Sequence, residues 1–365
     1  MSNERISGGE ARAILMLYVM GSTMIMGAAS NALNDAWLAI LIGIILTVPL
    51  VLIYARLLAL YPGQNLFDIC LQVFGKWAGR VLILIYVWYA LHLAALVLRN
   101  YGEFMESEAM PETPMLVPML LVALLCIFAV IKGIETMGRS ARLLFNICIA
   151  TVIFVLLLTI GRIEVENIFP IMDHGWMPIW KGAFYAFSFP FAETVLLTGI
   201  FSNVKDGKSF VRIFLYGLLI SGALVVFITF RNICVLGTYT MSNVSFPSYA
   251  AVGRINVGSF IQRIEGTVSI VFVICVFMKV SVCLLAASQG IAKLFNLQTY
   301  RSVVLQLGLL TTYFAYSLYD DIMEMWNFAM KTYAFYAFPF QVIFPILLLL
   351  GAEIKRRLRT QEKSG

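Results

Sequence analysis

The sequence predicts an all-α polytopic membrane protein with ten transmembrane helices, arranged as two inverted repeats of five. Hydrophobic residues make up 61% of the 365 residues and charged residues only 13%, and the mean hydropathy is +0.89. This composition is typical of a membrane bundle rather than of a soluble domain. The apolar residues form about ten stretches of spanning length. Two of these stretches, at corresponding positions in the two halves, are interrupted in the middle.

A spanning helix needs about 20 mostly apolar residues, and turn-forming or charged residues separate the stretches that reach this length. Such separators occur at 61–65, 111–114 and 205–208. The ten predicted spans are 13–32, 37–60, 80–103, 114–132, 142–161, 178–201, 210–236, 264–290, 302–319 and 328–351. The longest predicted connection is about 237–263, so we expect residues 1–365 to form a single membrane domain.

Lysine and arginine set the expected orientation, because cytoplasmic loops carry an excess of them. With the N-terminus in the cytoplasm, most of the 26 basic residues fall in inner loops. The exceptions are Arg162, Lys181, Arg254, Arg263 and Lys331 in outer loops, and Arg99, Arg231 and Lys279 within spans. Both termini are therefore predicted to be cytoplasmic. Five helices is an odd number, so the second repeat (about 178–351) enters the membrane from the opposite side to the first (about 13–161).

The first and sixth spans contain the residues expected to break a helix. Gly21 and Gly27 loosen the first, and Pro190 removes a backbone donor from the sixth. Broken helices persist in lipid only where they are buried or line a cavity, so they indicate a transporter-type binding site. Span 13–32 could instead be a cleaved signal peptide. A signal peptide begins with a positively charged region, whereas the charges that precede this span cancel. They are Glu4, Arg5, Glu10 and Arg12.

Three ionisable residues inside spans are candidates for function, because such groups are costly in lipid. Glu193 follows Pro190 by three residues and could contact a ligand amine or a proton, or could pair with a neighbouring helix for packing. Lys279 could stand where a transporter holds a sodium ion, or could form a structural pair, for example with Glu193. His92 lies beside Trp88 and is either a packing residue or part of the site.

The remaining polar and sulfur-containing groups have simpler interpretations. Arg99 and Glu103 are one helical turn apart and are expected to pair locally. Arg231 is expected to snorkel to the outer surface. The six cysteines lie in apolar stretches without ligand spacing, so we expect buried thiols and no metal site. The sequence contains no catalytic or nucleotide-binding motif, which argues against an enzyme and a cofactor. The basic residues lie in short loops, where charge sets membrane topology, so the net charge of +6 gives no reason to expect a nucleic-acid partner.

Several short motifs, in their order and spacing, resemble the B subunits of GerA-type spore germination receptors over about residues 5–360. The residues that carry the resemblance are Gly75-Lys76-Trp77, Phe246-Pro247-Ser248-Tyr249, Gln262-Arg263-Ile264-Glu265 with Lys279 in the following helix, Asp320-Asp321 and Lys355-Arg356-Arg357. The resemblance implies a LeuT-like fold of the amino acid–polyamine–organocation transporter superfamily. It also implies a nutrient-sensing subunit in the spore inner membrane, working with a membrane-embedded A subunit and a C lipoprotein.

The resemblance further implies which positions contact the nutrient, a small molecule such as an amino acid, a sugar or a nucleoside. These ligand-binding positions are Thr23 and Gly27 in the first span, His92 and Leu93 in the third, Phe189 and Glu193 in the sixth, and Met278 and Lys279 in the eighth. Family members that sense an amino acid have small or apolar residues around the third-span position. His92 therefore argues against an alanine-like ligand and leaves the nutrient open.

Two other functions are compatible with this fold, because a fold does not determine function. One is a secondary transporter, an amino acid permease coupled to protons or sodium. The other is a scaffold or ion-conducting subunit with a vestigial pocket. Vesicle uptake, germination of a deletion strain and the effect of pocket mutations distinguish the three.

Overall fold

The computed structural model describes residues 4–204, 210–255 and 264–362. Within these residues the chain is helical apart from short connections and an isolated bridge between Ile6 and Val204. Six described helices are long and apolar enough to cross a membrane: Ser30–Leu60, Leu66–Ala109, Ile134–Arg162, Phe210–Asn243, Gly266–Leu294 and Ile322–Leu358. The shorter helix Leu116–Lys132 is apolar as well. The chain is therefore a multi-pass membrane protein.

The helices follow one another with short connections. In the first half they are α1 (Gly8–Met20), α2 (Thr23–Met26), α3 (Ala36–Leu60), α4 (Leu66–Phe104), α5 (Leu116–Lys132) and α6 (Ile134–Thr159). In the second half they are α7 (Trp176–Ala186), α8 (Phe210–Asn243), α9 (Pro247–Gly253), α10 (Gly266–Leu294), α11 (Arg301–Tyr316), α12 (Ile322–Asn327), α13 (Tyr333–Phe338) and α14 (Phe344–Glu362).

Tighter and wider helical turns occur between them. The 3₁₀ segments are Ser30–Asp35, Ile160–Arg162, Val165–Ile168, Ala192–Gly199 and Phe201–Asn203. The π-helical turns are Met105–Ala109, Phe187–Phe191, Phe328–Thr332 and Pro339–Ile343. Three of the four π turns lie in segments that form the site described below, which agrees with the frequent occurrence of π turns at functional sites.

Several helix boundaries differ from those predicted by hydropathy. The third predicted span starts at residue 80, whereas α4 starts at Leu66 and bends at Gly75, whose φ is +77°. Hydropathy reports the part of a helix that lies in lipid, and a capping box of Asn65 and Asp68 starts this helix earlier. The predicted connection 237–263 contains α9. Residues 205–208, predicted as a turn, lie outside the described residues.

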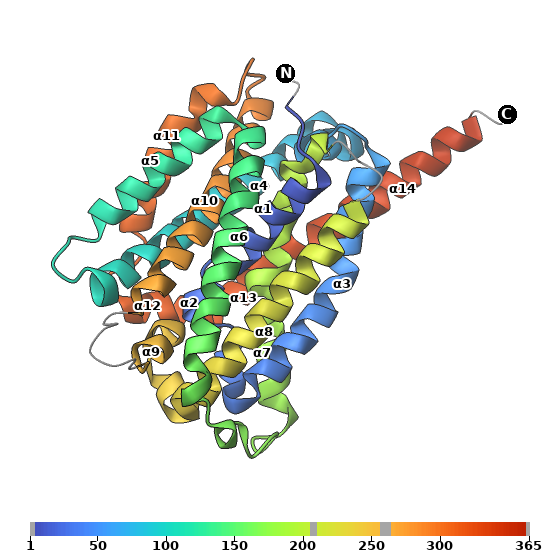
Figure 1. Cartoon of the computed structure of the whole chain (residues 1–365). Helices are drawn as coiled ribbons and strands as arrows, with labels where there is room; N and C mark the ends of the chain where they lie inside the picture. Colours follow the sequence, from blue (N-terminus) through green and yellow to red (C-terminus); the bar gives the residue numbers. More distant parts are fainter. Residues whose placement is uncertain (1–3, 205–209, 256–263, 363–365) are drawn as a thin grey trace.

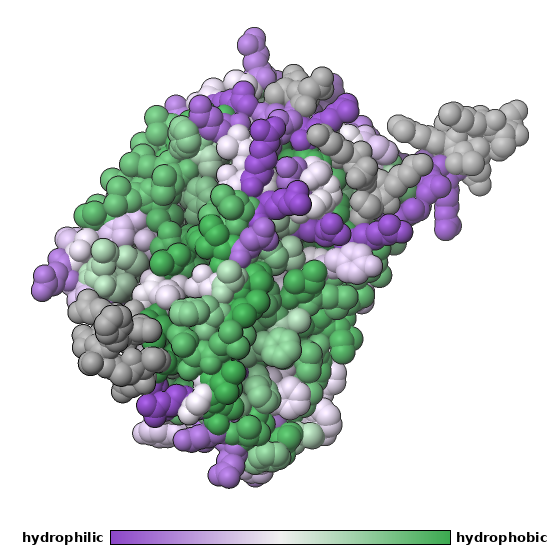
Figure 2. All heavy atoms as spheres, in the orientation of Figure 1, coloured by the Kyte–Doolittle hydropathy of each residue, from purple (hydrophilic) through white to green (hydrophobic). Residues whose placement is uncertain are grey.

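The centre of the bundle is formed by α1, α4 and α10. α4 packs along α10, α1 packs against α8, α6 and α10, and α3 packs against α7 and α8. α5 and α11 pair at one edge, and α14 projects beyond the bundle at the end that also carries the N-terminus (Figure 1). In α10 and α4 most residues of the apolar stretch are buried inside the protein, whereas in α6 most of them are exposed on its surface. Figure 2 shows this exposed apolar surface as a belt between two polar ends.

Candidate functional site

Two points of irregular backbone meet around one buried lysine. Gly21 (φ +22°, ψ −133°) separates α1 from α2, and Phe189 (φ −128°, ψ 109°) leaves the helical conformation inside the turn Phe187–Phe191. A Cβ placed on Gly21 would lie 2.6 Å from Lys279 Cδ. Lys279 Nζ lies 4.9 Å from the centre of the Phe189 ring. The side chain of Lys279 therefore lies between the two irregular points.

Lys279 forms a buried ion pair with Glu193. Its Nζ contacts Glu193 Oε2, and both side chains are fully buried. The hydroxyl of Tyr333 donates to the other carboxylate oxygen, Oε1. Tyr18 donates to the backbone carbonyl of Glu193 at 3.1 Å, and its ring lies 5.3 Å from Lys279 Nζ. Both carboxylate oxygens thus have a donor, as a buried charge requires.

A polar network extends from this pair into the last helical segment. The hydroxyls of Tyr89 and Tyr333 are 3.3 Å apart. Gln341 Nε2 donates to Tyr89 Oη and to the carbonyl of Ser188, both at 2.9 Å, and Ser188 Oγ donates back to Gln341 Oε1 at 3.0 Å. The network connects three parts of the chain to the Glu193 carboxylate. They are α4, the turn Phe187–Phe191, and the last helical segment, which comprises α13 and the turn Pro339–Ile343.

A small cavity of about 40 Å³ borders the carboxylate. Its walls are Met26, Leu93, Leu96, Val97, Asn100, Phe189, Glu193, Tyr319, Met325, Phe328, Ala329, Met330 and Tyr333. Small-molecule sites have volumes of about 300–1,000 Å³. The cavity is therefore too small for such a molecule in this conformation, and a small-molecule ligand could enter only if part of the wall moves.

Three of the eight sequence-predicted site residues line this cavity, and a fourth forms an ion pair with one of these three. Leu93, Phe189 and Glu193 are in the wall, and Lys279 contacts Glu193. The predicted possibility of a Glu193–Lys279 pair thus agrees with the geometry.

The other four predicted residues lie outside the wall. Thr23 donates to the carbonyls of Val19 (2.9 Å) and Met20 (2.7 Å), which the end of α1 leaves without helical partners. Met278 is buried without lining the cavity. Gly27 has φ +77°, and a Cβ there would meet no atom within 4 Å, so its constraint is backbone conformation rather than close contact.

His92 has the environment of a packing residue. It is 8% exposed, and its Nδ1 lies 2.8 Å from Tyr336 Oη. Its ring stacks on Trp88 with centroids 5.5 Å apart and contacts Phe314 and Phe328. The side chain therefore joins α4 to α11 and to the last helical segment. Of the two interpretations predicted for His92, this geometry favours packing.

Sequence reasoning missed the residues that complete the site. Tyr333, Tyr89 and Gln341 make the polar network, and Asn100 in the cavity wall donates to Ser22 Oγ at 3.3 Å beside Gly21. Gln341 could have been found, because it is an amide within the predicted span 328–351. The tyrosines gave no such signal among the 16 in the chain.

The predictions for two arginines within the spans, Arg99 and Arg231, compare differently with the structure. Arg99 pairs with Glu103 at 2.7 Å, as predicted, and also donates to the carbonyl of Tyr316 at 2.8 Å. The prediction that Arg231 snorkels to the surface is wrong. Arg231 is 5% exposed and donates to Asn232, so its charge is held inside the protein.

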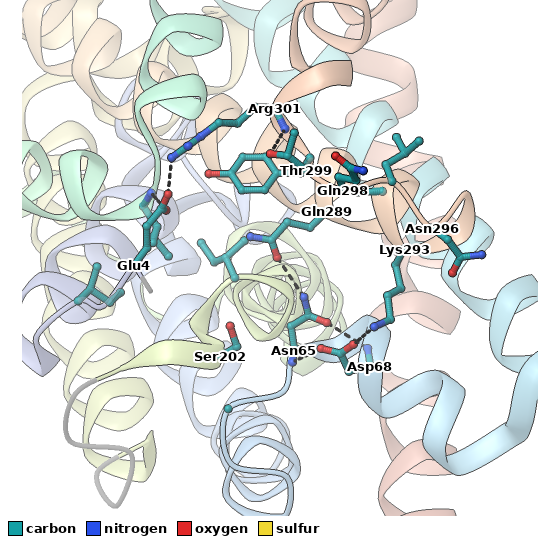
Figure 3. Close-up of a pocket in the computed structure, with 17 residues that line it drawn as sticks. Glu4, Asn65, Asp68, Ser202, Gln289, Lys293, Asn296, Gln298, Thr299 and Arg301 are labelled. Atoms are coloured by element: carbon teal, nitrogen blue, oxygen red, sulfur yellow. Dashed lines mark hydrogen bonds and ion pairs between the residues drawn. The ribbon is translucent and has the colours of Figure 1, made fainter. Parts of the chain in front are cut away.

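A larger cavity of about 530 Å³ lies at the end of the bundle that carries the N-terminus. Figure 3 shows two ion pairs at its opposite sides, Glu4–Arg301 and Asp68–Lys293, while Asn65 donates to Gln289 between them at 3.1 Å. Burial raises the pKa of the Tyr300 hydroxyl at its rim above the ordinary tyrosine value, so this group is neutral in the cavity. Because its charges pair with one another, we regard this cavity as a polar vestibule.

Solved transporter structures share the fold of this chain over most of its length. Mhp1, a nucleobase-cation-symport-1 family transporter in a closed conformation with bromovinylhydantoin bound, has a TM-score of 0.70 at 12% identity, covering 92% of this chain and 75% of its own. MhsT in complex with L-phenylalanine has a TM-score of 0.66 at 12% identity, covering 96% of both chains. The fold therefore defines a transporter-like membrane protein of the LeuT type.

The family is narrower than the fold. A family described as Spore germination protein matches residues 5–325, and the chain belongs to this family. Spore germination protein KB of Bacillus subtilis (strain 168) is 28% identical over 100% of this chain and 98% of its own. Spore germination protein A2 of the same organism is 24% identical over 82% and 81%. The resemblance stated from the sequence is confirmed, although its Gln262 and Arg263 lie outside the described residues.

Proposed function

We propose that this chain is the nutrient-binding subunit of a spore germination receptor and that the cavity beside Glu193 is its nutrient site. The observation that carries the proposal is the buried carboxylate shared by Lys279 and Tyr333 at the wall of a small cavity. An intramembrane ion pair is expensive and is usually kept for function. Membership of the germination family favours this function over the proton- or sodium-coupled amino acid permease.

The finer architecture is part of the proposal. We infer ten spans in one membrane domain, with repeats at about 13–161 and 178–351 and with the first and sixth spans broken. Support comes from the six long apolar helices, from the irregular backbone at Gly21 and Phe189, and from the transporter-like fold. We place the protein in the spore inner membrane with cytoplasmic termini, together with an A subunit and a C lipoprotein.

Sensing requires a difference in nutrient affinity between two states of the protein, because a ligand shifts an equilibrium only by that difference. The segment Met325–Tyr333 forms one wall of the cavity, and Tyr333 within it donates to Glu193. Moving this wall to admit a nutrient would break the Tyr333 contact. A nutrient that donates to the same oxygen would stabilise the opened state, and the displaced segment would report binding to the partner subunits.

The test uses spores that lack the gene, complemented with the unmutated gene or with Glu193→Gln, and a panel of amino acids, sugars and nucleosides. We expect the deletion to abolish the response to one nutrient class. Glu193→Gln should raise its half-maximal concentration about tenfold or more, because a hydrogen bond to a charged group contributes about 1.5–3 kcal/mol. Germination is followed by the fall in optical density, and protein level by immunoblot.

The matched control is Glu353→Gln, which removes a carboxylate from the exposed pair with Arg56 and should leave the response unchanged. A normal dose response of Glu193→Gln would contradict the site assignment. If Glu193→Gln does not accumulate, the double variant Glu193→Gln/Lys279→Met, which leaves no buried charge at this point, carries the test, and its normal dose response would contradict the assignment. Accumulation of the active nutrient in vesicles that contain the purified protein would favour the permease.

A further inference from the structure

A second buried cation lies outside the midplane site. Arg231 in α8 is 5% exposed, and its Nε and Nη2 donate to Asn232 Oδ1 at 3.2 and 2.5 Å. Asn232 in turn donates to Ser248 Oγ at 3.0 Å. Among the described residues no carboxylate oxygen lies within 4 Å of this guanidinium. A buried guanidinium that contacts only a neutral amide lacks a counter-charge, which is strongly unfavourable in a membrane interior.

A small cavity of about 30 Å³ borders this arginine. It lies among five helices and is lined by Met24, Thr151, Val152, Val155, Ile228, Arg231, Ser248, Thr267, Val268 and Val271. A cavity of about 10–15 Å³ is already enough for one water molecule. This cavity therefore has room for one or two water-sized species, and a nutrient or a polyatomic metabolite is too large for it.

The polar groups around the cavity favour a negative charge. Thr151 and Thr267 donate to their own helices, to the carbonyls of Ile147 and Ile264 at 2.9 and 2.6 Å. Ser248 Oγ accepts from Asn232, so its hydrogen can be donated elsewhere. Within the described residues Arg231 Nη1 has no hydrogen-bond acceptor. The groups left to meet a ligand are thus a guanidinium and a hydroxyl, both of which donate.

We propose that this cavity binds a small monovalent anion of the size of chloride, held by Arg231 and Ser248. The anion would supply the counter-charge that the surrounding described residues do not. α2 would be affected directly, because Met24 of α2 lines this cavity and Met26 of the same short helix lines the cavity beside Glu193. The anion site stands on its own, whereas its influence on the nutrient response rests on the proposed function.

The test measures the thermal unfolding midpoint of the purified protein while chloride replaces gluconate at constant ionic strength. Gluconate is too large for the cavity. We expect a saturable rise in the midpoint with chloride, a similar rise with bromide, and no rise for Arg231→Gln. Ser248→Ala keeps the charge and removes one donor, so it should need several-fold more chloride for the same rise.

Two controls keep the test decisive. Arg254→Gln removes a positive charge from an exposed residue outside the cavity and should keep the chloride dependence. If Arg231→Gln does not fold, the test rests on Ser248→Ala, whose unfolding midpoint should rise only at higher chloride concentrations than that of the unmutated protein. Equal midpoints in chloride and gluconate, or an unshifted curve for Ser248→Ala, would overturn the proposal. The germination response of Glu193→Gln is scored separately, so failure of the anion site and failure of the nutrient site are distinguishable.

Discussion

Removing either partner of the Lys279–Glu193 pair should destabilise the protein far more than removing both. Both side chains are fully buried, so Lys279→Met leaves a carboxylate inside the protein with Tyr333 as its remaining side-chain donor. Glu193→Gln leaves an uncompensated ammonium. Each single change should lower the free energy of unfolding by about 3–5 kcal/mol. The double variant contains no buried charge at this point and should lose less than either single variant.

The assay is a double-mutant cycle on purified protein in detergent, followed by denaturant or thermal unfolding of all four forms. The exposed pair Arg56–Glu353 is the matched control, because a solvated pair contributes only about 0–1 kcal/mol. Spores carrying the double variant should contain the protein but fail to respond to the nutrient. Stability and sensing are thereby separated.

Two results would refute this reasoning. If the single variants are no less stable than those of the Arg56–Glu353 control, the charges are not buried together as described. If the double variant has a normal dose response, the charges contribute to folding only. The nutrient site must then lie elsewhere.

Two further predictions concern the same region. Gly27→Ala and Gly27→Leu should both raise the half-maximal nutrient concentration, because a φ of +77° is strained for any residue with a side chain and the neighbouring Met26 lines the cavity. Gly75→Ala and Gly75→Leu are the controls, because Gly75 has the same φ outside the cavity, and a silent Gly27→Leu would show that the backbone at this position does not influence the site. If Lys279 replaces a bound cation, the nutrient affinity of the purified receptor should be equal in sodium chloride and in choline chloride. The affinity should be lost in Lys279→Met. A sodium requirement in the unmutated protein would contradict this replacement and favour the sodium-coupled permease.

Much of the fold follows from hydropathy, because lipid thickness fixes the length of an apolar stretch. The predicted span 37–60 ends where α3 ends, and 114–132 ends where α5 ends. The prediction was poorer where a helix continues beyond the lipid, as in α4 from Leu66. It was also poorer in 328–351, where two π turns divide a single apolar stretch. Hydropathy carries no information about such turns.

The charged half of the candidate site was visible in the sequence, and the neutral half was not. Glu193 and Lys279 stand out because an ionisable group in an apolar stretch is rare. Tyr333 and Tyr89 resemble any other aromatic residue of a membrane helix until their hydroxyls are placed beside Glu193 and beside each other. Their roles depend on contacts between helices that are far apart in the chain, and a single sequence does not encode those contacts as a local pattern.

The geometry of Lys279 bears on the choice between sensing and transport. A transporter that uses a sodium gradient must bind the ion on one side of the membrane and release it on the other. An ammonium that belongs to the chain, packed between the irregular backbone at Gly21 and the Phe189 ring, cannot be released as an ion. A site with this built-in charge can still change its nutrient affinity between two conformations. That difference in affinity is all that a receptor requires to shift an equilibrium, so the fixed ammonium fits a sensor better than a sodium-driven transporter.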